Sequence, residues 1–83
     1  SAGEAEALNY LGEVYNSLGE YPEAQKVLTP ALAIYQKLNN RQGQGNVLDN
    51  LGETYSGLKE YPKALKTFQE ALSIRREVND KKG

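Results

Sequence analysis

The side chains that could do chemistry are carboxylates and amides that recur at helical spacing in two parts of the chain. They are Glu6, Asn9, Glu13 and Asn16 in the first part, and Asn46, Asp49, Glu53 and Ser56 in the second. Residues three and four apart share one face of a helix, so each group forms a polar stripe. The two stripes hold four carboxylates, three amides and no lysine or arginine. We predict that this surface binds segments that carry Lys or Arg, or an exposed amine, and that binding weakens as salt rises.

Two asparagines, Asn9 and Asn50, are further candidates for contact with an extended peptide. An Asn amide donates and accepts hydrogen bonds at once, so it can hold a peptide backbone. Asparagine is also a poor helix former in mid-helix, which favours a functional role over a purely structural one. For any single residue of the stripes, a solvated polar face is the simpler interpretation. Tyr10, next to Asn9, is either a ligand contact or merely a residue near the terminus.

Several classes of function are excluded by composition. The chain has no histidine and no cysteine, so it lacks the usual catalytic base, disulfides and thiolate metal sites. It has no phosphate-binding loop and no nucleophile–base pair, so we expect no enzyme activity, no cofactor and no metal. The net charge of −1 is not that of a nucleic-acid binder. No apolar run approaches the roughly 20 residues that cross a bilayer, and the N-terminal residues do not resemble a signal peptide, so we expect a cytoplasmic protein.

The polar stripes belong to an internal repeat of 40 residues. The segment LGEVYNSLGEYPEA at 11–24 returns as LGETYSGLKEYPKA at 51–64, and the pair Ala31-Leu32 returns as Ala71-Leu72. Apolar residues at spacings of three and four predict two helices in each unit. We place the helices near 3–18, 22–38, 43–58 and 62–78. The 83 residues then form one all-α domain with repeat 1 at about 3–42 and repeat 2 at about 43–82.

Glycine, proline and tyrosine give more detailed expectations. Gly52 lies on an apolar face, where we expect it to let the two units approach closely. Gly57 is expected in or near an exposed turn, and Tyr61 is expected to be mostly buried. Pro30 falls in mid-helix, where it removes a hydrogen bond, and we favour a tolerated kink on the outer side over a change in curvature.

The pattern resembles the tetratricopeptide repeat over essentially the whole chain. The matching positions in the first unit are Leu8, Leu11-Gly12, Tyr15, Tyr21, Ala24, Leu28 and Ala31-Leu32, and the second unit has Leu48, Leu51-Gly52, Tyr55, Tyr61, Ala64, Phe68 and Ala71-Leu72. The period of 40 differs from the family's usual 34. The resemblance implies a right-handed α-solenoid, expected to be a fragment of a longer array, in which the first helix of each unit lines a concave surface that binds proteins or peptides. The two polar stripes and Asn50 would then face that surface.

Two other functions remain open at this level. The chain could be a structural, idealised or designed repeat module that only folds and stacks, or a regulatory segment of a larger signalling enzyme. Stripe residues differ between the units while core residues match, which favours binding over an idealised scaffold. Because terminal repeats need a polar cap and none is present, we also expect head-to-tail association, or exchange of helices through the hinge at 39–43.

Overall fold

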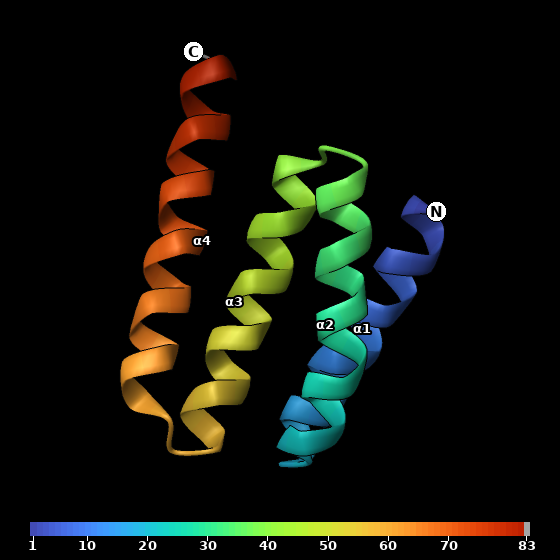
Figure 1. The fold of residues 1–83 in the computed structure, drawn as a ribbon, viewed down its shortest axis with the longest axis vertical. Helices are drawn as coiled ribbons and strands as arrows, with labels where there is room; N and C mark the ends of the chain where they lie inside the picture. The colour runs from blue at the N-terminus through green and yellow to red at the C-terminus, as the bar shows by residue number, and fades with distance from the viewer. Residues whose placement is uncertain (83) are drawn as a thin grey trace.

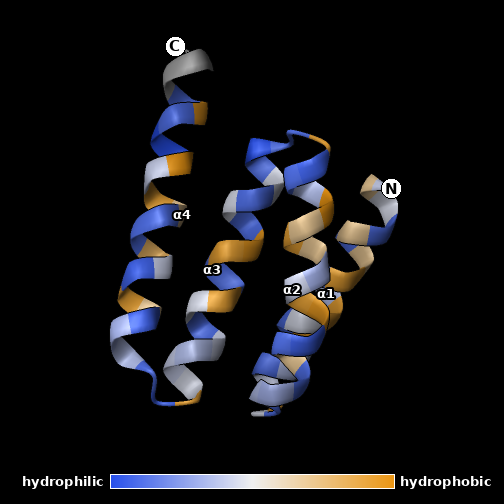
Figure 2. Cartoon of the chain, in the orientation of Figure 1, coloured by the Kyte–Doolittle hydropathy of each residue, from blue (hydrophilic) through white to orange (hydrophobic). Residues whose placement is uncertain are grey.

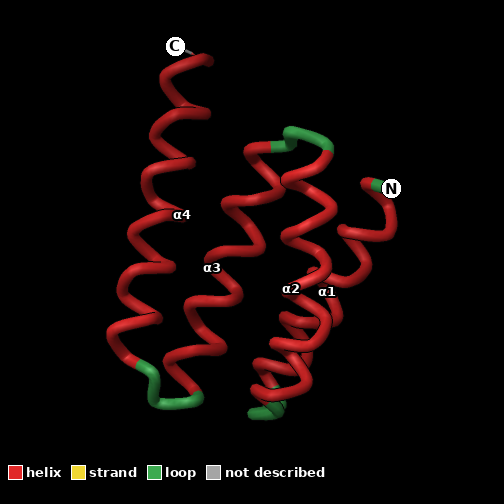
Figure 3. Tube along the Cα trace, in the orientation of Figure 1, coloured by secondary structure: helices red, strands yellow, loops and turns green. Residues whose placement is uncertain are grey.

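The computed structural model describes residues 1–82 as four helices joined by three short loops (Figures 1 and 3). The helices are α1 (Ala2–Ser17), α2 (Tyr21–Lys37), α3 (Arg41–Gly57) and α4 (Tyr61–Lys82). Helices α1 and α2 form the first antiparallel pair, and α3 and α4 form the second. Helix α3 packs against each of the other three helices. The predicted all-α solenoid of helix–turn–helix repeats is confirmed.

The helices begin where the sequence supplies caps. Ser1 precedes α1, and its hydroxyl accepts a hydrogen bond from the Glu4 backbone N–H at 3.2 Å. Asn40 precedes α3, and its side chain accepts from the Gly43 N–H at 2.8 Å. These bonds satisfy backbone donors that have no partner within the helix. Pro22 lies in the first turn of α2, where a missing N–H costs nothing.

All three loops end the preceding helix with the same hydrogen-bonding pattern. The N–H of the third loop residue donates to a carbonyl five residues earlier, at 2.9 Å for Glu20, Asn40 and Glu60 alike. The residue before each of these has a positive φ: 75° at Gly19, 54° at Asn39 and 65° at Lys59. Glycine takes this left-handed conformation without cost, whereas lysine does not. Gly57 is the last residue of α3 and lies directly before the third loop, near an exposed turn as expected, but Lys59 and not Gly57 takes the left-handed conformation.

The conformation of Lys59 predicts a stabilising substitution. Lys59→Gly should raise the free energy of unfolding by about 1 kcal/mol, because a side chain in the left-handed region costs roughly that much. Lys59→Ala is the matched control, since it removes the charge and the long side chain but keeps the Cβ atom. Urea denaturation of the three proteins would measure the effect. Equal stabilisation by glycine and alanine would contradict the backbone explanation.

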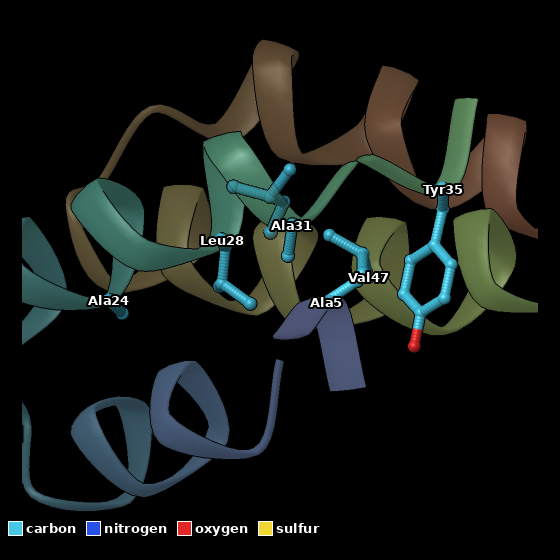
Figure 4. Close-up of a cluster of buried hydrophobic side chains, with 7 residues drawn as sticks. Ala5, Ala24, Leu28, Ala31, Tyr35 and Val47 are labelled. Atoms are coloured by element: carbon cyan, nitrogen blue, oxygen red, sulfur yellow. The ribbon is translucent and has the colours of Figure 1, made fainter. Parts of the chain in front are cut away.

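The core lies mainly between the two units. Ala24, Leu28, Ala31 and Tyr35 of α2 meet Ala5 of α1 and Val47 and Leu51 of α3, and all seven are buried. Figure 4 shows Leu28 and Tyr35 projecting from α2 toward the helices that cover them. A second cluster joins Leu48 of α3 to Ala71 and Ile74 of α4. Figure 2 shows apolar residues recurring between polar ones along all four helices.

Glycines on α1 and α3 allow the helices to approach each other. A methyl group at Gly12 would overlap the Leu28 side chain, and one at Gly52 would lie 2.6 Å from the Phe68 ring. Both contacts are within a unit, so the expectation that Gly52 packs the two units together is wrong. The close contact between units is made by Gly57, where a methyl group would overlap the ring of Tyr21. Gly43 makes a second such contact under the Tyr35 ring.

Two further expectations need correction. Helix α4 was expected to end near residue 78, but it continues to Lys82. In the first unit, Asn39 turns the chain so that α3 can pack back on α2, and α4 meets no such turn before Lys82. Tyr61 was expected to be mostly buried, but 59 % of it is exposed, because none of the helices among the described residues covers that side of α4. Helix α2 continues through Pro30, which is exposed, in agreement with a tolerated proline.

Candidate binding surface

A polar hollow of about 330 Å³ opens where the first helices of the two units meet. It is lined by Asn9 and Glu13 of α1, by Asn46, Asp49 and Asn50 of α3, and by Arg75 of α4. The two helices present these residues together because they pack against each other and because the positions on each helix are three or four residues apart. Five of the nine residues proposed from the sequence therefore surround one feature.

The side-chain amides of Asn9 and Asn50, both of which line this hollow, are hydrogen-bonded to each other. The Asn50 Nδ2 donates to the Asn9 Oδ1 at 2.8 Å, from α3 to α1. Both side chains are partly exposed. The hydrogen bond orients the two amides, so the Asn9 Nδ2 and the Asn50 Oδ1 have a fixed spacing. The pair offers one donor and one acceptor, which is the pattern that an extended backbone complements.

Asn16 is not part of the accessible surface, which corrects the sequence prediction. Its side chain is only 4 % exposed. The Asn16 Nδ2 donates to the Asn50 carbonyl at 3.0 Å, and its Oδ1 accepts from the Thr54 hydroxyl at 2.8 Å. Asn16 therefore lies in the contact between α1 and α3, because this edge of the stripe faces the helix interface. Its amide holds the two units together and is not available to a ligand.

The surface is also less acidic than its sequence predicts, because α4 contributes an arginine. The Arg75 guanidinium forms an ion pair with the Asp49 carboxylate and approaches the Asn46 Oδ1 at 3.4 Å. Arg75 therefore lies beside the second stripe, although neither stripe itself contains a lysine or arginine. The side chain of arginine is long enough to reach across α3 from the second helix of the unit, and the pairing compensates the charge of Asp49.

Of the remaining stripe residues, Glu13 lines the hollow, and Glu6, Glu53 and Ser56 are not among its lining residues. Glu13 and Glu53 are exposed, one turn along α1 and α3 from the amide pair, and neither forms an ion pair within the described part of the chain. Glu6 is exposed and lies toward Tyr35. The pKa of the Tyr35 phenol is raised, first by burial and second by the charge of Glu6. Ser56 is half-buried, and Tyr10 is 69 % exposed without lining the hollow.

Other chemistry has little support in the described residues. No three carboxylates among them come close enough to hold a metal ion. None of the helices in the described range is both long and apolar enough to span a bilayer. Two further hollows flank α4, one lined by Ile74 and Val78 and the other by Leu32 and Glu70, and each mixes apolar and polar side chains.

The fold and the paired helices define a helical repeat protein, and comparison with known families identifies which one. The family model described as tetratricopeptide repeat matches residues 3–77. The chain therefore belongs to the tetratricopeptide repeat family. Neither the curated proteins nor the solved structures gave a significant match. Family membership supports a scaffold for protein interaction.

Proposed function

We propose that the chain is a non-catalytic scaffold that binds an extended protein segment across the polar hollow. The observation that carries this proposal is the Asn9–Asn50 amide pair, fixed at 2.8 Å between the two units and open to solvent. A peptide that crosses the hollow would receive one hydrogen bond from the amide pair and donate one to it. Such binding selects an extended backbone rather than a particular side chain.

The preference for a basic segment rests on Glu13 and Glu53. They lie on α1 and α3, one turn from the amide pair, and neither forms an ion pair within the described residues. Asp49 contributes less, because Arg75 already compensates its charge. A segment with Lys or Arg near Glu13 or Glu53 would gain electrostatic attraction. Arg75, beside Asp49, would favour a neutral or acidic residue next to it.

Charge reversal of the two glutamates tests this function. Glu13→Lys combined with Glu53→Lys should weaken binding of a labelled Lys/Ser peptide by about tenfold or more, because attraction becomes repulsion. A peptide of about eleven residues can span the 36 Å length of the molecule when extended. Fluorescence anisotropy at low and high salt would measure the affinity, and circular dichroism would check that the helices are retained.

The matched control carries the same change in charge on another surface. Glu20 and Glu70 are exposed, lie outside the polar hollow and form no ion pair within the described residues. Glu20→Lys combined with Glu70→Lys should change the affinity little and only through the net charge. A Glu/Ser peptide should bind neither protein well. Equal loss in the two double variants would show that net charge, and not the hollow, determines binding.

We also propose that the chain associates with itself through the two ends of the helix stack. The observation that favours this second function is an unpaired apolar stripe at each end. Helix α4 exposes Tyr61, Leu65, Phe68 and Leu72, which we call the α4 stripe. Helix α1 exposes Leu11, Val14 and Leu18, which we call the α1 stripe. Both are large side chains at helical spacing, a pattern that marks contact surfaces.

A further inference from the structure

The repeat relates each exposed stripe to a buried contact inside the same molecule. Forty residues before Phe68 stands Leu28, which is fully buried, and forty residues after Leu11 stands Leu51, which is 4 % exposed. Leu28 and Leu51 belong to one cluster at the contact between α2 and α3. The α4 stripe is thus the second unit's copy of the surface that receives α3, and the α1 stripe is the first unit's copy of the surface that α3 presents.

This correspondence identifies what covers the α4 stripe. We infer that a second copy of the chain docks head to tail, with its α1 on the α4 stripe of the first copy, and that Ser17 limits the affinity of this contact. The inference rests on the proposed self-association and adds its register. We call the contact between the two copies the junction. Each pair of residues in contact between α2 and α3 predicts a pair at the junction. The α2 residue number plus forty gives the residue in the first copy, and the α3 residue number minus forty gives the residue in the second copy.

The register places a steric conflict at Ser17. Inside the chain, the ring of Tyr21 lies on Gly57, where even a methyl group would overlap it. The corresponding pair at the junction is Tyr61 on Ser17 of the second copy. Serine has the Cβ atom that glycine lacks, so the Tyr61 ring cannot take the position that Tyr21 takes. Tyr61 is 59 % exposed and can rotate away, which permits docking but loses that ring contact.

The junction also lacks one polar bond of the internal contact. The hydrogen bond from Thr54 to Asn16, at 2.8 Å, is replaced by Val14 of the second copy facing Ser56. Valine cannot donate, so this bond is not formed. Apolar burial remains, through Leu11 against Phe68. The internal contact is therefore favoured over the junction, and copies should associate reversibly. The contact joins two different surfaces and does not close, so it adds copies in a row.

A pair of blocked variants tests the register. Leu11→Lys removes the α1 stripe of one protein, and Leu72→Lys removes the α4 stripe of the other. Both leucines are at least 40 % exposed, so each variant should fold. Each variant alone should be monomeric in sedimentation equilibrium, the mixture should form a one-to-one complex that grows no further, and the unmodified chain should increase in mass with concentration. A dimer that persists in either single variant, or an unmodified chain that stays monomeric at millimolar concentration, would overturn the inference.

Substitution of Ser17 tests the limiting residue separately. Ser17→Gly should tighten association about fivefold or more, because it restores the space that Gly57 provides inside the chain. Ser17→Ala keeps the Cβ atom and should not tighten it. Equal affinities for the two variants would refute the role of Ser17. Peptide binding is measured separately, on the monomeric Leu11→Lys protein. None of these substitutions changes a residue that lines the polar hollow, so failure of self-association and failure of peptide binding can be distinguished.

Discussion

Gly12→Ala should lower the free energy of unfolding by about 2 kcal/mol and the melting temperature by roughly 10 °C. The added methyl group would overlap the side chain of Leu28, which is completely buried and so cannot move outward into solvent. Overpacking of this kind exceeds the roughly 1 kcal/mol that alanine gains over glycine in a helix. Thermal and urea denaturation monitored by circular dichroism would measure both quantities.

Two other glycines provide controls for this result. A methyl group at Gly3, in the same helix, would meet only the Ser1 hydroxyl at 4.0 Å, so Gly3→Ala should be neutral or slightly stabilising. Gly52 has the same place in the second unit as Gly12 in the first, but its neighbour Phe68 is 40 % exposed and can move outward. Gly52→Ala should therefore cost less than Gly12→Ala. If Gly12→Ala and Gly52→Ala lower the free energy of unfolding equally, the freedom of the neighbouring side chain to move outward does not determine the effect.

Asn16→Ala should destabilise the chain by about 2–3 kcal/mol, because it removes two hydrogen bonds and leaves the Thr54 hydroxyl with one fewer partner. The cavity left between α1 and α3 adds to the loss. Ser56 stands at the same place in the second unit and is half-buried, and its side chain forms no hydrogen bond within the described residues, so Ser56→Ala should change stability by less than about 0.5 kcal/mol. Urea denaturation of both variants would give the comparison.

Peptide affinity distinguishes a structural role for Asn16 from a ligand contact. Measured well below the melting temperature, Asn16→Ala should retain most of the affinity for the Lys/Ser peptide, because the side chain is buried. If the variant lost affinity for the peptide while its stability stayed unchanged, Asn16 would be a ligand contact and not a structural residue.

The fold was predictable from the sequence because its determinants are local and occur twice. The spacing of Leu28 and Ala31, and the proline at the start of α2, fix the helices and their apolar faces. The end of α4 was not predictable in the same way, since a helix stops where a turn is stabilised, and the sequence near residue 79 resembles that near residue 39 without the packing of a following helix.

The candidate surface was predictable in part, and the errors have two physical causes. Asn9 and Asn16 are the same residue type on the same face of α1, yet one lines the hollow and the other is buried. A face wider than one residue can turn either edge toward a neighbouring helix, and periodicity does not specify which edge. Arg75 was missed because a long side chain reaches beyond the face of its own helix. The close contact of Gly57 with the Tyr21 ring was also missed. A serine–glycine pair at a helix end is typical of a turn, and only the packing of α2 on α3 brings Tyr21 over the glycine.

The position of α3 between the other three helices determines how the molecule opens. Every helix-to-helix contact except that between α1 and α2 involves α3. Backbone amides in the middle of α3 can therefore reach solvent only when the whole chain unfolds, whereas the far end of α4 can fray while the remaining contacts persist. In hydrogen–deuterium exchange, the protection of central α3 amides would equal the global free energy of unfolding and would serve as an internal gauge of stability. Protection along α4 should decline toward its C-terminal turns, so the rate of exchange there reports local opening alone.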